Sequence, residues 1–224
     1  MPKAIIAALR ALGAGQVSAQ TGSVDDSAKA EGGAFAVEPL HTRVLFGVSH
    51  FGFTTYYGEF SGVSGALDLD PKNPSASKLD IRIPAASVST TNAELNRELK
   101  GEEWFDTAKY PNISFKATKV TMTGPGKADV VGDLTLHGTT KPIVLHAVFH
   151  GAGVNPLNKH YTVDFDASAK IKRTEFGVST LVPLVRDDVD IIRRVIRASE
   201  LAALGNVARK PATRRSNAVL ILRR

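Results

Sequence analysis

Six histidines are the side chains of this 224-residue chain that best suit metal binding or acid–base chemistry. His146 and His150 stand four residues apart in a stretch where polar and apolar residues alternate, a pattern typical of a strand. Along a strand that spacing amounts to about 13 Å, whereas zinc holds its ligands at about 2 Å. The pair therefore cannot share one metal ion, and we expect both side chains on the outer surface.

His50 differs from these two histidines because it ends an apolar run. Phe46, Val48 and His50 alternate in sequence and therefore share one face of a predicted strand. One polar residue at the end of an apolar face suits a contact with the polar head group of a ligand. The alternative is a histidine with a purely structural role.

No recognised catalytic pattern accompanies the histidines. The sequence has no Gly-x-Ser-x-Gly elbow, no glycine-rich phosphate loop and no cysteine. Asp68 and Asp70 alternate beside a proline turn, which favours two solvent-exposed carboxylates over a catalytic pair. We therefore predict no enzymatic activity, no metal site and no cofactor.

The elements that position these side chains are predicted to be strands, because short alternating segments are separated by turn residues. Gly124-Pro-Gly126 and Asn155-Pro156 are examples of such turns. Strands are expected at residues 41–50, 55–70, 77–88, 112–122, 128–137, 142–151, 160–173, 177–185 and 188–196. This series predicts an all-β fold.

One helix is predicted between the strands. Thr91 and Glu94 have the spacing of a capping box, in which both side chains bond to free backbone amides. Leu95 and Leu99 then share one face, and Gly101 is expected to end the helix. Two aromatic residues follow, so the helix either plugs an opening of the fold or simply closes one end of the core.

The start of the chain resembles a targeting segment. Residues 1–19 contain a basic residue, an apolar stretch and the small residues Val17-Ser-Ala19, which predicts a secretory signal peptide. Residues 20–34 are rich in Ser, Asp, Gly and Ala and are predicted to be a linker.

The net charge of +6 is confined to the other end of the chain. From residue 186 onward there are 10 basic and 4 acidic side chains, which accounts for the whole excess. A protein that binds nucleic acid would carry its charge on the folded surface, so we predict no nucleic-acid partner. Residues 198–224 form a basic tail that we expect to be disordered. It either attracts anionic membrane lipids or is an aberrant extension without a function.

Several short motifs resemble, in their order and spacing, the YceI-like family of polyisoprenoid-binding, lipocalin-like proteins of bacterial periplasms. They extend from about Phe35 to Val185. The motifs are His41-x-x-Val-x-Phe-x-Val-x-His50, Tyr57-Gly-Glu-Phe60, Leu67-Asp-Leu-Asp-Pro71, Ser87-Val-Ser-Thr90, Trp104-Phe-Asp-Thr-Ala-Lys-Tyr-Pro111, Gly132-Asp-Leu-Thr-Leu-His-Gly-Thr-Thr-Lys-Pro142 and Phe176-Gly177. Family members usually carry Arg-Asp-x-His-Leu in the helix, where this chain has Leu95-Asn-Arg-Glu-Leu99.

The resemblance implies an eight-stranded antiparallel lipocalin-like barrel with one inserted helix, over residues 35–197. It implies a non-catalytic periplasmic protein that binds, stores or transports a polyisoprenoid in the barrel tunnel. An apolar tunnel suits this ligand, because burial contributes about 0.8 kcal/mol per CH₂ group. The alternatives are a lipocalin-like carrier of a fatty acid or other amphiphile, a small barrel enzyme, and an interaction protein that uses the basic tail.

The candidates for lining the tunnel are mostly aromatic residues of the expected inner faces. The predicted ligand-binding residues are Phe46, Val48, His50, Phe53, Phe60, Trp104, Phe115, Phe149 and Phe165. Simple core packing is the alternative role for each of them. The sequence leaves open which lipid is bound and whether the protein is a monomer or a homodimer.

Overall fold

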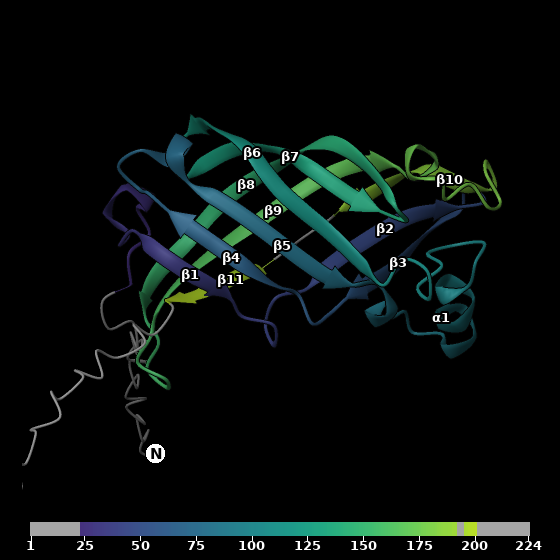
Figure 1. Cartoon of the computed structure of the whole chain (residues 1–224), viewed down its shortest axis with the longest axis horizontal. Helices are drawn as coiled ribbons and strands as arrows, with labels where there is room; N and C mark the ends of the chain where they lie inside the picture. Colours follow the sequence, from purple (N-terminus) through teal and green to yellow (C-terminus); the bar gives the residue numbers. More distant parts are fainter. Residues whose placement is uncertain (1–22, 192–194, 201–224) are drawn as a thin grey trace, which may run out of the picture.

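Alternating segments of the chain form one antiparallel sheet that curls into an elongated barrel, with a single helix at one end (Figure 1). This computed structural model describes residues 23–191 and 195–200. The strands are β1 (Gly33–Val37), β2 (Val44–His50), β3 (Thr54–Phe60), β4 (Ser64–Leu69), β5 (Lys78–Pro84), β6 (Asn112–Gly124), β7 (Lys127–Leu136), β8 (Thr139–Val154), β9 (Tyr161–Lys172), β10 (Val185–Ile191) and β11 (Val195–Glu200). The helix is α1 (Ala93–Lys100), and the short helical turns are η1 (Ser27–Lys29), η2 (Pro74–Ala76), η3 (Ala85–Ser87) and η4 (Arg173–Phe176).

The eleven strands occupy eight positions around the barrel. β1 pairs with β4 and β11, while β2, which follows it in the chain, pairs with β3 and β10. β1 and β2 therefore share one position around the barrel, as do β3 and β4, and β10 and β11. β9 pairs with both β10 and β11, and a bridge between Glu59 and Ser89 joins β3 to the chain that follows η3. This confirms the predicted all-β antiparallel barrel with one inserted helix, but the described residues form eleven strands where eight were predicted.

The strand expected at residues 177–185 is a loop as far as residue 184. Gly177 and Leu181 have φ values of 77° and 60°, outside the extended region that a strand requires. Ladder pairing begins only at Val185, the first residue of β10. The apolar residues of this loop therefore do not belong to the alternating pattern of the barrel wall.

The ends of the barrel also differ from the predicted boundaries. Val24 forms a bridge with Ala152, and Ala30 is buried, so part of the expected linker at 20–34 packs against the barrel. β11 extends to Glu200, three residues into the segment that we expected to be tail. The predicted signal peptide and the tail beyond residue 200 lie outside the described residues.

Helix α1 begins at a different cap from the one predicted. The side-chain oxygen of Asn92, not of Thr91, accepts hydrogen bonds from the backbone N–H groups of Glu94 and Leu95, at 2.9 and 3.2 Å. Asparagine is a favoured residue at this position because its short side chain reaches the free amides directly. Gly101 ends the helix as predicted.

The inner face of the barrel is apolar because alternate residues of each strand point inward. In β7 the buried residues are Val130, Gly132, Leu134 and Leu136. Gly132 leaves room for the ring of Phe115 on the neighbouring strand, since a Cβ there would lie only 2.4 Å from the ring atom Cζ. The ring of Phe115 therefore packs directly against the backbone of β7 inside the barrel.

Candidate ligand-binding tunnel

Two apolar cavities lie inside the barrel, one toward each end. The first, which we call the alanine chamber, has a volume of about 120 Å³ and is lined by Ala128, Ala147 and Ala167 together with larger apolar side chains. Its rim includes η1, η2 and the turn between β6 and β7, at the end of the barrel opposite α1 (Figure 1). Two exposed lysines, Lys78 and Lys127, stand at this rim.

The alanine chamber owes its space to three small side chains in a row. Ala128 pairs with Ala147, and Ala147 pairs with Ala167, so three methyl groups lie side by side across β7, β8 and β9. Phe149 and Phe165 line the same chamber with their rings 5.4 Å apart in an edge-to-face arrangement. Small residues beside large ones leave a hollow that the backbone alone would not produce.

The second cavity, which we call the helix chamber, has a volume of about 110 Å³ and lies next to α1. Leu99 of α1 and the two aromatic residues after the helix, Trp104 and Phe105, form one wall. The indole Nε1 of Trp104 donates a hydrogen bond to Glu98 Oε1 at 3.1 Å, which fixes the ring against the helix. The helix therefore forms part of the wall of a cavity and does not only close the core.

A narrow waist separates the two chambers. Along β7 the alanine chamber touches Ala128 and Val130, and the helix chamber touches Leu134 and Leu136. Gly132 lies between them, and the buried ring of Phe115 covers it. Ile81 of β5 is buried at the same level and also lines neither chamber. The chambers therefore lie in line along the barrel axis, with the side chains of Phe115 and Ile81 between them.

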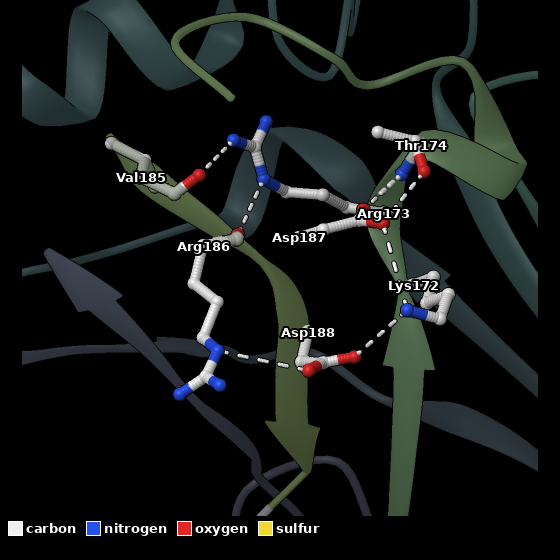
Figure 2. A network of polar contacts seen from close by, with 7 residues as sticks. All are labelled: Lys172, Arg173, Thr174, Val185, Arg186, Asp187 and Asp188. Carbon is white, nitrogen blue, oxygen red and sulfur yellow. Dashed lines mark hydrogen bonds and ion pairs between the residues drawn. The ribbon is translucent and has the colours of Figure 1, made fainter. Parts of the chain in front are cut away.

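A buried arginine is the polar feature of the helix chamber. Arg173 begins η4, directly after β9, and only 5% of its surface is exposed. Its Nε donates to the carbonyl of Arg186 at 2.9 Å, and one terminal nitrogen donates to the carbonyl of Val185 at 2.7 Å (Figure 2). The other terminal nitrogen donates to the carbonyl of Val178 at 3.0 Å. The guanidinium also lies over the ring of Trp104, 5.5 Å from the centroid. Arg173 thereby fixes the loop before β10 to the helix-side wall.

A carboxylate next to this arginine is held by its own set of partners. The backbone N–H and the hydroxyl of Thr174 each donate to Asp187 at 2.9 Å, and Lys172 lies 4.0 Å away (Figure 2). Burial raises the pKa of Asp187, but the two bonds from Thr174 and the charges of Lys172 and Arg173 outweigh it and lower the pKa. Burial lowers the pKa of Arg173, and the charge of Asp187 opposes that effect.

We expect Asp187→Asn to destabilise the protein at neutral pH and to have little effect in acid. The folded pKa lies below the unfolded value near 3.8. The charged carboxylate therefore contributes stability that is complete above that value and is lost as the pH falls through the folded pKa. We expect a loss of about 1 kcal/mol at neutral pH, measured by urea unfolding, and a loss that becomes smaller as the pH falls through the folded pKa.

The matched control is Asp188→Asn. Asp188 pairs with Lys172 and Arg186 at 3.4 and 3.7 Å, and all three side chains are partly exposed. Exposed pairs of this kind contribute between about 0 and 1 kcal/mol, so the control should change the free energy of unfolding less than Asp187→Asn. Equal losses for Asp187→Asn at neutral and acidic pH would contradict the assignment.

Most of the predicted ligand-binding residues line one of the two chambers. Phe46, Val48, Phe60 and Trp104 line the helix chamber, Phe149 and Phe165 line the alanine chamber, and Phe115 forms the waist. The structure brings these seven residues together inside the barrel. Their contact with a ligand stays a prediction.

His50 and Phe53 line neither chamber. Phe51 and Gly52 have φ values of 51° and 74°, so the hairpin between β2 and β3 turns away from the barrel interior directly after His50. The ring of His50 meets the ring of Phe51 edge-to-face with centroids 4.1 Å apart, and Phe53 is 88% exposed. We expected inward- and outward-facing residues to alternate through to Phe53, but this alternation ends at the turn after His50.

Arg173 and the three alanines were not among the predicted binding residues. Arg173 ends the run Lys170-Ile-Lys-Arg173, which has the composition of a solvent-exposed strand end. Alanine occurs in every kind of environment, so a single alanine does not indicate a cavity. Only the inward position of three alanines on strands that become neighbours could have indicated one. His146 and His150, by contrast, lie on the outer face as expected, each 2.7 Å from a carboxylate.

Comparison with known proteins agrees with this architecture. The model of the YceI-like domain matches residues 35–195. The chain belongs to the YceI-like family. Relatives include Protein YceI of Shigella sonnei and a UPF0312 protein of Pseudomonas syringae pv. tomato. Each is 37% identical over 155 residues, which cover 69% of this chain and 80% of the relative.

Solved structures share the fold. Burkholderia cenocepacia BcnA has a TM-score of 0.64 at 22% identity and covers 74% of this chain and 99% of its own. The Campylobacter jejuni YCEI protein has a TM-score of 0.60 at 30% identity, with 68% and 90% covered. A polyisoprenoid binding domain from Saccharophagus degradans, implicated in plant cell wall breakdown, has a TM-score of 0.55 at 17% identity, with 76% and 100% covered. The described part of this chain includes no helix with the length and hydrophobicity to cross a membrane.

Proposed function

We propose that this protein binds one long isoprenoid-type lipid inside the barrel and carries or stores it without changing it chemically. The observation that carries this proposal is the arrangement of the alanine chamber and the helix chamber in line along the barrel axis. Their linings are almost wholly apolar. One flexible chain that passes the ring of Phe115 would occupy both chambers, and each buried CH₂ group would contribute about 0.8 kcal/mol.

The family supports an isoprenoid as the ligand class. A polyisoprenoid binding domain from Saccharophagus degradans has the same fold. No group of three or more potential metal ligands occurs among residues 23–191 and 195–200, and the described chambers are lined by side chains that bind and do not react. These observations favour a binding protein over the alternative of a small barrel enzyme.

The site of action that we propose is the bacterial periplasm. The amino-terminal pattern of residues 1–19 supports export. We further propose that the basic residues beyond position 200 attract anionic lipid head groups, at about 1 kcal/mol per basic residue near the surface. Such an attraction would bring a lipid carrier to its donor and acceptor membranes.

Organic extraction of the purified full-length protein, followed by mass spectrometry, tests the proposal. We expect one isoprenoid lipid per barrel, and a higher melting temperature when isoprenoids are added to the extracted protein. A fatty acid as the sole extracted ligand would favour the alternative of a lipocalin-like carrier of amphiphiles. Absence of any lipid, together with an unchanged melting temperature, would contradict a carrier function.

A further inference from the structure

The helix chamber is lined by one charged side chain among apolar ones. Of the eighteen described residues that line it, Arg173 alone is charged, and the other seventeen are apolar. A cation inside an apolar cavity is unfavourable unless an anion or several hydrogen bonds compensate it. The question is therefore what neutralises Arg173.

The described protein supplies hydrogen bonds to this cation but no direct ion pair. No carboxylate of the described residues lies within 4.0 Å of Arg173. Asp187 is the charge that acts on it from further away, and its oxygens already accept two hydrogen bonds from Thr174. In Figure 2 the Asp187 carboxylate lies toward Thr174 and Lys172, while the guanidinium points toward the start of β10. Among residues 23–191 and 195–200, the positive charge of Arg173 therefore has no carboxylate in contact with it.

The guanidinium also keeps unused donors. It has five N–H groups, and three of them donate to the carbonyls of Val178, Val185 and Arg186. One N–H on each terminal nitrogen remains for another acceptor. The three bonds and the ring of Trp104 fix the position of the guanidinium, and Arg173 lines the chamber. We infer that a ligand in the chamber would meet these remaining donors in a fixed arrangement.

We propose that Arg173 is the head-group site of the tunnel and that the natural ligand carries an anionic oxygen head group, a phosphate or a carboxylate. The head group would lie in the helix chamber, and the chain would pass Phe115 into the alanine chamber. This inference rests on the proposed function, because it assigns the polar end of the same lipid.

A competing site for an anion exists at the opposite end of the barrel. Lys78 and Lys127 stand at the rim of the alanine chamber, and both side chains are exposed. Water and salt screen exposed charges, so these lysines discriminate weakly between a charged and a neutral head group. Arg173 is buried away from water and salt, so it should prefer an anionic over a neutral head group more strongly than the two lysines do.

The experiment compares two probes of equal chain length, geranylgeranyl phosphate and geranylgeraniol, on the full-length protein. Binding is followed by the fluorescence of Trp104, the single tryptophan of the chain. We expect the unmodified protein to bind the phosphate about ten- to a hundredfold more tightly than the alcohol. Arg173→Gln should bring this ratio close to one, Arg173→Lys should keep part of it, and Lys78→Gln with Lys127→Gln should leave it unchanged.

The ratio of affinities separates head-group binding from a structural role. An Arg173→Gln variant that only loosens the barrel would weaken both probes by the same factor, and that result would overturn the inference. So would equal affinities in the unmodified protein, or loss of the preference in the double lysine variant. If Arg173→Gln does not fold, the unmodified protein and Arg173→Lys still decide the question. Failure of both probes to bind would instead contradict the proposed function itself.

Discussion

Replacing Ala147 with phenylalanine is expected to lower the affinity for a long isoprenoid by about a hundredfold. Ala147 is the middle member of the alanine row, paired with Ala128 on one side and Ala167 on the other. A phenylalanine ring at this position would fill the alanine chamber. Exclusion of only four CH₂ groups from a buried site costs about 3 kcal/mol, which corresponds to that loss of affinity.

The folded protein should tolerate this substitution. The ring would enter existing space, so we expect the free energy of unfolding to stay the same or to rise by about 0.5–2 kcal/mol. Val148→Phe is the matched control, because Val148 is the next residue of β8, points outward and is 36% exposed. It should bind lipid normally. Equal affinities of Ala147→Phe and Val148→Phe in a lipid titration would contradict the assignment of the alanine chamber to the lipid chain.

Replacing Gly65 with alanine is expected to cause the largest loss of stability. Gly65 lies in β4 opposite Ile81 of β5, with a φ of 150° that side chains rarely allow. A Cβ at this position would lie 2.0 Å from the carbonyl oxygen of Asp80. The backbone conformation alone costs about 1–3 kcal/mol, and displacement of the β5 carbonyl costs a similar amount again. Urea unfolding should show a loss of roughly 2–6 kcal/mol.

Gly33→Ala separates the two contributions. Gly33 in β1 has the same φ of 150°, but no atom lies within 4 Å of the position that its Cβ would take. The control therefore carries the conformational cost without the collision, and we expect about half the loss of Gly65→Ala. Equal losses in the two variants would show that close packing between β4 and β5 is not what requires glycine at position 65.

Much of the barrel could be predicted from local patterns. Alternation identified the inner face of β2 and the outer face of β8, because period two is imposed by the strand itself. Glycine and proline turns separated the strands, and Gly101 ended the helix as predicted. The error at residues 177–185 has a long-range cause. The shape of that loop depends on the bonds of Arg173 to Val178 and Val185, and no local pattern reveals them.

The candidate site was predicted less well than the fold. Aromatic residues on inner faces indicated seven positions that line the tunnel or its waist. The space in the alanine chamber comes from alanines on three strands. These alanines lie side by side only because of the register in which the strands pair. The polar centre of the helix chamber is an arginine at the end of a basic run, whose burial results from the loop and Trp104 closing over it. Both features depend on residues far apart in the sequence, which explains why the sequence alone did not indicate them.

The most direct test of the tunnel is a titration of Trp104 fluorescence with an isoprenoid quinone, whose ring quenches a nearby indole. Trp104 is the single tryptophan and is buried in the wall of the helix chamber, so its emission reports occupancy of that chamber. We predict saturable quenching at one quinone per protein that an isoprenoid alcohol of the same length reverses. Quenching that rises linearly without saturation, and that the alcohol does not reverse, would contradict a lipid-binding tunnel.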